Sequence, residues 1–180
     1  MIPNFDKDGF LPVGDHEATF DELRASVLVQ GPAGYPNWDR EWRSRLVDSL
    51  EILTRQLWAA GITEIFADGS FAEDKEHPND IDGYFVCDKM DLATGDLQQR
   101  LNLLDPHKVW TWSAASRRAY QGGKKQLPMW HHYRIELYPH FGQLTGILDE
   151  FGNNLEFPAA FRKSRRGHRA RGIIKIGMNP

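Results

Sequence analysis

The Gly69-Ser70 pair and the Asp80-Ile81-Asp82 tripeptide after it constrain this chain more than any other feature. Side chains alternate along a β-strand, so Asp80 and Asp82 are predicted to point to the same face of a sheet. Two such carboxylates repel each other unless a cation lies between them, and Mg²⁺ prefers oxygen ligands of this kind together with substrate phosphates. The Gly-Ser turn offers backbone N–H groups and a hydroxyl that can hold a phosphate. The unit therefore predicts a site for a metal ion and a triphosphate.

The apolar periodicity predicts an α/β (α+β) fold with a small mixed sheet flanked by helices. Helices are expected after the capping box at 19–22, from residue 37 or 39 to 60, and over 91–104. The apolar stripe of the second helix is expected to consist of Leu46, Leu50, Leu53 and Leu57. Strands are expected over 62–67, 80–87, 130–138 and 173–176. The segment 110–120 is ambiguous, with a helix over 113–120 as one interpretation. Residues 1–36 are expected to form an N-terminal arm with a short helix, and residues 37–180 the main domain.

Glu136 is a third acid of interest because it lies between apolar Ile135 and Leu137 in a predicted strand. A buried carboxylate is costly unless it is paired or binds a metal. Arg134 shares the predicted strand face, so an Arg–Glu pair is the simplest interpretation of Glu136 alone. Beside the two aspartates a metal role is favoured, since two metal ions about 3.5–4 Å apart need several carboxylate oxygens.

The Gly-Ser pair, the Asp-x-Asp strand and the later acid together resemble the nucleotidyltransferase fold of the DNA polymerase beta superfamily. The flanking residues resemble more closely a poorly characterised bacterial family of small nucleotidyltransferase-like proteins, over most of the chain. The segments that carry this likeness are Ile2-Pro3-Asn4-Phe5 through Gly9-Phe10-Leu11-Pro12, Asp68-Gly69-Ser70-Phe71 with Lys75, Pro78-Asn79-Asp80-Ile81-Asp82, Glu136 with Tyr138-Pro139, and Gly172-Ile173-Ile174. Asp68 and Gly83 stand where the superfamily pattern prefers apolar residues.

The resemblance implies a metal-dependent enzyme that moves a nucleoside monophosphate from an NTP, such as ATP, to a hydroxyl. Asp80 and Asp82 would bind Mg²⁺ or Mn²⁺, and Glu136 would help to hold a second metal and to deprotonate the acceptor. Gly69, Ser70 and Lys75 would bind the phosphates. The acceptor would be a protein side chain, an RNA 3′ end or a small molecule.

Stand-alone enzymes of this size are, by the same resemblance, often toxins or defence proteins, so a cognate antitoxin or another protein partner is expected. The alternative is a catalytically inactive module that keeps the fold and binds nucleotide, RNA or a protein.

A basic block, residues 162–175, contrasts with the net charge of −3 of the whole chain. It contains seven cations and no acid: Arg162, Lys163, Arg165, Arg166, Arg169, Arg171 and Lys175. Such a block predicts either an anionic partner such as RNA or a solvated tail. If nucleic-acid binding by this block were the main function, Asp80, Asp82 and Glu136 would have a structural role only.

Three broader expectations follow from composition. The single cysteine, Cys87, excludes an internal disulfide and is typical of a reducing compartment. No apolar run approaches the about 20 residues needed to span a bilayer, and the N-terminus lacks the pattern of a signal peptide, so a cytoplasmic protein without a membrane partner is expected. Zinc is a weak alternative, because His131, His132 and His140 have no Cys or Asp pattern beside them.

Overall fold

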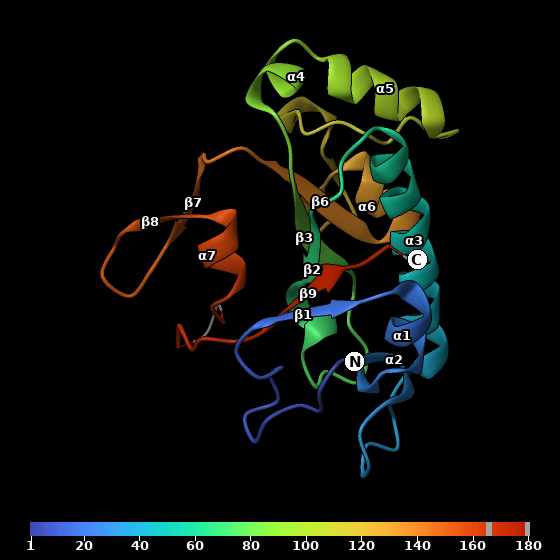
Figure 1. Ribbon diagram of the computed structural model, residues 1–180, viewed down its shortest axis with the longest axis vertical. Coiled ribbons are helices and arrows are strands. Elements are labelled where there is room, and N and C mark those ends of the chain that lie inside the picture. The colour runs from blue at the N-terminus through green and yellow to red at the C-terminus, as the bar shows by residue number, and fades with distance from the viewer. Residues whose placement is uncertain (165–166, 179–180) are drawn as a thin grey trace.

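The computed structural model describes residues 1–164 and 167–178 and has a mixed five-stranded sheet at its centre (Figure 1). Its strands, in spatial order, are β1 (Asp15–Ala18), β9 (Ile173–Ile176), β2 (Ile65–Asp68), β3 (Ile81–Val86) and β6 (Ile135–His140). The β1–β9 and β3–β6 pairs are parallel, whereas β2 runs antiparallel to both of its neighbours. The predicted fold class is confirmed.

Helices cover one face of this sheet and enclose the main core (Figure 1). They are α1 (Phe20–Ala25), α2 (Val27–Gln30), α3 (Arg40–Ala59), α5 (Asp96–Leu104) and α6 (Pro128–Tyr133). The short helix α4 (Lys89–Ala93) precedes α5 and buries no residue. The predicted α3 stripe of Leu46, Leu50, Leu53 and Leu57 is fully buried. Asp39 caps this helix, because its side chain accepts a hydrogen bond from the Trp42 N–H at 2.9 Å. No helix in the described ranges has both the length and the apolarity to cross a lipid bilayer.

The opposite face of the sheet is only partly covered. The hairpin of β7 (Leu144–Leu148) and β8 (Asn154–Glu156) projects from the body beside α7 (Phe157–Phe161), as Figure 1 shows. Phe161 packs against Phe66, Tyr84 and Ile173 in a small second core. The rest of this face carries the acidic side chains discussed below.

The expected strand over 130–138 is wrong in its first half. Pro128 begins the short helix α6, a position where its missing N–H costs nothing, and Arg134 ends that helix with a left-handed φ of 56°. The strand therefore starts only at Ile135. His131 and His132 consequently lie on a helix and not on opposite strand faces.

Three other segments also differ from expectation. Gly95, with φ 83°, divides the expected helix over 91–104 into α4 and α5. In the ambiguous segment 110–120, a 3₁₀ turn (Ala114–Ser116) precedes β4 (Arg118–Ala119), which pairs with β5 (Lys125–Gln126). The N-terminal arm contributes β1, which pairs with β9 at Asp15↔Ile173. The expected strand over 173–176 is confirmed as β9.

Candidate active site

The strand register aligns three carboxylates in one row. Asp68 at the end of β2 lies directly opposite Asp82 of β3, and Asp82 lies directly opposite Glu136 of β6. Directly opposed residues of neighbouring strands project from the same face of a sheet. Each of three adjacent strands therefore supplies one acid to the partly covered face.

Asp80 lies just before β3 and is held by an aromatic neighbour. The indole N–H of Trp130 donates a hydrogen bond of 2.7 Å to its carboxylate. The guanidinium of Arg134 lies 3.9 Å from the Trp130 ring centroid and so stacks on the indole. Helix α6, which was not expected, thus fixes the first acid of the Asp-x-Asp pair.

The Gly69–Ser70 turn begins a 3₁₀ helix, η1 (Gly69–Ala72), that follows β2 directly. Gly69 has φ 78°, and a Cβ on it would lie 2.8 Å from a carboxylate oxygen of Asp82. Glycine is therefore required for the turn to adopt this conformation so near the acid. Buried Arg43 of α3 holds the following loop by donating hydrogen bonds to the carbonyls of Phe71, Glu73 and Lys75.

All six residues predicted for the site line one cavity of about 570 Å³, named here the acidic cavity. They are Gly69, Ser70, Lys75, Asp80, Asp82 and Glu136. Lys124, from the loop between β4 and β5, also lines it and was not predicted. Two lysines beside several carboxylates suit a phosphate-bearing ligand bound together with a cation.

Glu136 is buried and held by two hydrogen-bond donors and one ion pair. Its carboxylate accepts hydrogen bonds from the Leu127 N–H at 3.0 Å and the Tyr138 hydroxyl at 2.5 Å. Arg117 lies 3.5 Å from the same carboxylate, so the basic partner of Glu136 is Arg117 and not the expected Arg134. Burial, followed by the charge of Glu136 and this hydrogen bond, raises the pKa of the Tyr138 phenol.

Asp68 completes a buried ion-pair network that the sequence analysis did not include. Arg171 bonds both Asp68 and Glu73, and both Asp68 and Arg171 are buried. Burial raises the pKa of the Asp68 carboxyl, and the Arg171 charge opposes that rise. The unusual acid before Gly69-Ser70 was the only available signal, because its partner lies about a hundred residues further along the chain.

The donor chemistry at Asp80 and Asp82 fits a hard cation such as Mg²⁺. Across residues 1–164 and 167–178, no three His, Cys, Asp or Glu side chains are arranged so that they could enclose a metal ion. Mg²⁺ is commonly held by one or two carboxylates, with water and substrate phosphates as its other ligands. Two aspartates would be enough protein ligands for such an ion, and metal-binding roles for Asp80, Asp82 and Glu136 stay predictions.

The basic block is part of the folded body where the structure describes it. Arg162 pairs with Asp15, Lys163 with Glu150, Arg169 with Asp8, and Lys175 approaches Glu17 at 3.9 Å. Arg165 and Arg166 lie outside the described residues. These pairs argue against a solvated tail, and an anionic partner for the block stays a prediction.

Comparison with known families gives one match. The family of unknown function DUF6932 matches residues 3–177, which is nearly the entire chain. The chain belongs to DUF6932. No curated protein and no solved structure matches it. Membership in DUF6932 names no activity, so the chemistry of this chain has to be argued from the acidic cavity.

Proposed function

We propose that this DUF6932 protein is a metal-dependent nucleotidyltransferase. The observation that carries the proposal is the alignment of Asp82 with Glu136 on adjacent strands, in the cavity that also contains the Gly69–Ser70 turn. Transfer from a nucleoside triphosphate requires acids that bind cations, together with a turn and lysines that bind phosphates. The resemblance to the nucleotidyltransferase superfamily adds to this support.

Each residue has a proposed role in binding. Asp80 and Asp82 would hold Mg²⁺ or Mn²⁺. A bound metal ion would neutralise part of the negative charge of the triphosphate. Ser70, Lys75 and Lys124 would bind the terminal phosphates. Trp130 keeps Asp80 in place through its 2.7 Å hydrogen bond, and Gly69 allows the turn to approach Asp82.

The proposed reaction is a substitution at the α-phosphorus of the NTP. The acceptor oxygen forms a bond to this phosphorus while the bond to the oxygen bridging the α- and β-phosphates breaks. Pyrophosphate leaves with that electron pair, and the acceptor proton passes to the carboxylate of Glu136. The acceptor class is a hydroxyl of a protein, an RNA 3′ end or a small molecule, with a toxin or defence role as one setting.

A specific observation favours the second candidate, a module that binds nucleotide without turnover. Two hydrogen bonds and the nearby Arg117 already engage the Glu136 carboxylate. An acid engaged in this way is a poorer acceptor for a proton or ligand for a metal than a free one. This module would bind an NTP with Mg²⁺ and transfer nothing.

The test is incubation of the purified protein with each α-labelled NTP, Mg²⁺ or Mn²⁺, and a cell extract, followed by analysis of which fraction carries label. Label transfer that Asp82→Ala abolishes, and that Asp96→Ala at an exposed site on α5 retains, supports the enzyme. Metal-dependent NTP binding without label transfer supports the binding module. Absence of both overturns the proposed site.

A further inference from the structure

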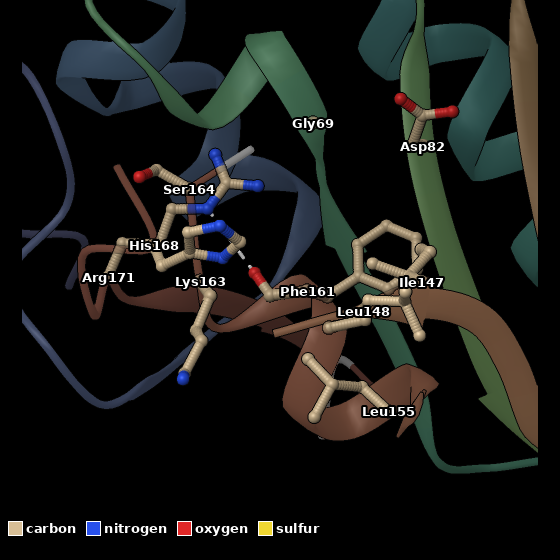
Figure 2. Close-up of a pocket in the computed structure, with 11 residues that line it drawn as sticks. Gly69, Asp82, Ile147, Leu148, Leu155, Phe161, Lys163, Ser164, His168 and Arg171 are labelled. Atoms are coloured by element: carbon tan, nitrogen blue, oxygen red, sulfur yellow. Dashed lines mark hydrogen bonds between the residues drawn. The ribbon is translucent and has the colours of Figure 1, made fainter. Parts of the chain in front are cut away.

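A second, smaller cavity adjoins the acidic cavity and has a different chemical character. Its volume is about 130 Å³. Ile147 and Leu148 of β7, Leu155 of β8, and Ala160 and Phe161 of α7 form its apolar wall. Figure 2 shows Ile147, Leu148, Leu155 and Phe161 grouped below Asp82, with Lys163, Ser164 and His168 to their left. We call it the apolar cavity.

The two cavities share part of their lining. Gly69, Asp82, Ser164 and Arg171 line both of them. A ligand whose charged part lies beside Asp82 can therefore extend an uncharged part directly onto the apolar wall. Ligand sites typically combine such an apolar surface with a few polar groups that fix orientation.

We propose that the apolar cavity receives the base of the nucleotide whose phosphates occupy the acidic cavity, an inference that rests on the proposed function. A base has apolar faces and a polar edge, which match an apolar wall with Lys163, Ser164 and His168 at its side. An apolar protein cavity of about 150 Å³ encloses a benzene molecule, so the volume here suits an aromatic ring.

The position of Glu136 favours the base over the acceptor as occupant. The proposed proton acceptor lines the acidic cavity, and it is absent from the described residues that line the apolar cavity. The acceptor hydroxyl must approach Glu136. The apolar cavity, which Glu136 does not line, is thus left for the base.

The test compares binding of ATP, GTP, CTP and UTP with binding of inorganic tripolyphosphate, each with Mg²⁺, by titration calorimetry. The wild-type protein should bind at least one NTP about tenfold or more tightly than tripolyphosphate, because the base adds contacts that tripolyphosphate lacks. Ala160→Leu fills the apolar cavity and should remove this advantage while tripolyphosphate binds as before. Ala159→Leu, an equal change at the exposed neighbouring position on α7, should retain the advantage.

The outcomes distinguish failure of the proposed base site from failure of the proposed function. Equal binding of NTP and tripolyphosphate by the wild type, or an undiminished NTP advantage in Ala160→Leu, overturns the base site and leaves the proposed function standing. Absence of Mg²⁺-dependent binding of every ligand overturns the proposed function together with the base site. If Ala160→Leu does not fold, Leu148→Gln, at a half-exposed position of the same wall, replaces it and should weaken NTP binding alone.

Discussion

The two faces of the central sheet differ in what their side chains do. On the helix-covered face, Ile81 and Phe85 of β3 are fully buried in the main core. On the other face, Asp82 of the same strand lines the acidic cavity, and Tyr84 belongs to the small second core. A single strand therefore contributes to stability on one side and to the candidate site on the other.

The two faces differ in what makes the burial of their side chains favourable. Apolar groups gain free energy when they leave water, so the helix-covered face needs only shape complementarity. A buried carboxylate loses hydration and needs a partner. Asp68 has Arg171, and Glu136 has Arg117 and Tyr138. The acidic face is stable only because residues distant in the sequence neutralise it, and variants on the two faces should behave differently.

Asp82→Ala should produce the largest effect. That effect should be on activity, with no loss of stability. Loss of a proposed metal ligand removes several kcal/mol of transition-state stabilisation, so transfer of label should fall by roughly 10⁴-fold. The thermal midpoint should stay the same or rise, because Asp82 is one of a row of like charges. Transfer assays and thermal unfolding on the same preparation measure both; transfer at the wild-type rate would remove Asp82 from the mechanism.

Phe85→Ala, three residues further along β3, should show the reverse pattern. Phe85 is fully buried and packs against Trp110 and Trp112, with ring centroids 6.2 Å and 5.9 Å away. Its truncation should lower the free energy of unfolding by about 3–5 kcal/mol in urea titrations. At a temperature where the variant is still folded, Mg²⁺-tripolyphosphate binding should be retained. A loss below 1 kcal/mol would mean that the helix-covered face is not the stabilising one.

Arg171→Ala should destabilise the acidic face by about 3 kcal/mol at neutral pH, because it leaves Asp68 buried without its cation. Burial raises the pKa of Asp68 in the folded protein above its unfolded value. The folded variant therefore binds the proton more readily, and its stability should fall as pH rises from the unfolded pKa through the raised folded pKa and recover as pH decreases. Urea titrations across pH measure this. Arg171→Ala with Asp68→Asn should restore part of the loss; no recovery would assign the loss to the contact with Glu73.

Asp39→Ala should give the smallest effect, about 1 kcal/mol, through loss of the α3 cap. The Trp42 N–H, and after it His77, lowers the pKa of the Asp39 carboxyl. Its contribution is therefore present above the unfolded pKa and disappears as pH falls through the folded one. The difference in unfolding free energy between wild type and Asp39→Ala should shrink in acid. Asp39→Asn, which can still cap the helix, should cost less than alanine at neutral pH.

The sequence by itself predicted what depends on short-range pattern. The capping box at Thr19, a helix cap at Asn37 or Asp39, the α3 stripe and the strand of Asp82 were all read from spacing. The structure confirms them and has Asp39 as the cap. Spacing, together with the resemblance to nucleotidyltransferases, also identified six of the residues that line the acidic cavity. Their chemical roles stay predictions.

Tertiary structure decided the partners and the surroundings of those residues. Pro128 and Arg134 place α6 where alternation had suggested a strand, and that helix supplies Trp130 to Asp80. Arg117 reaches Glu136, Arg171 reaches Asp68, and the β7–β8 hairpin meets α7 around the apolar cavity. These contacts join segments far apart in the chain, so no local pattern encodes them. They depend on which elements pack together to bury the sheet.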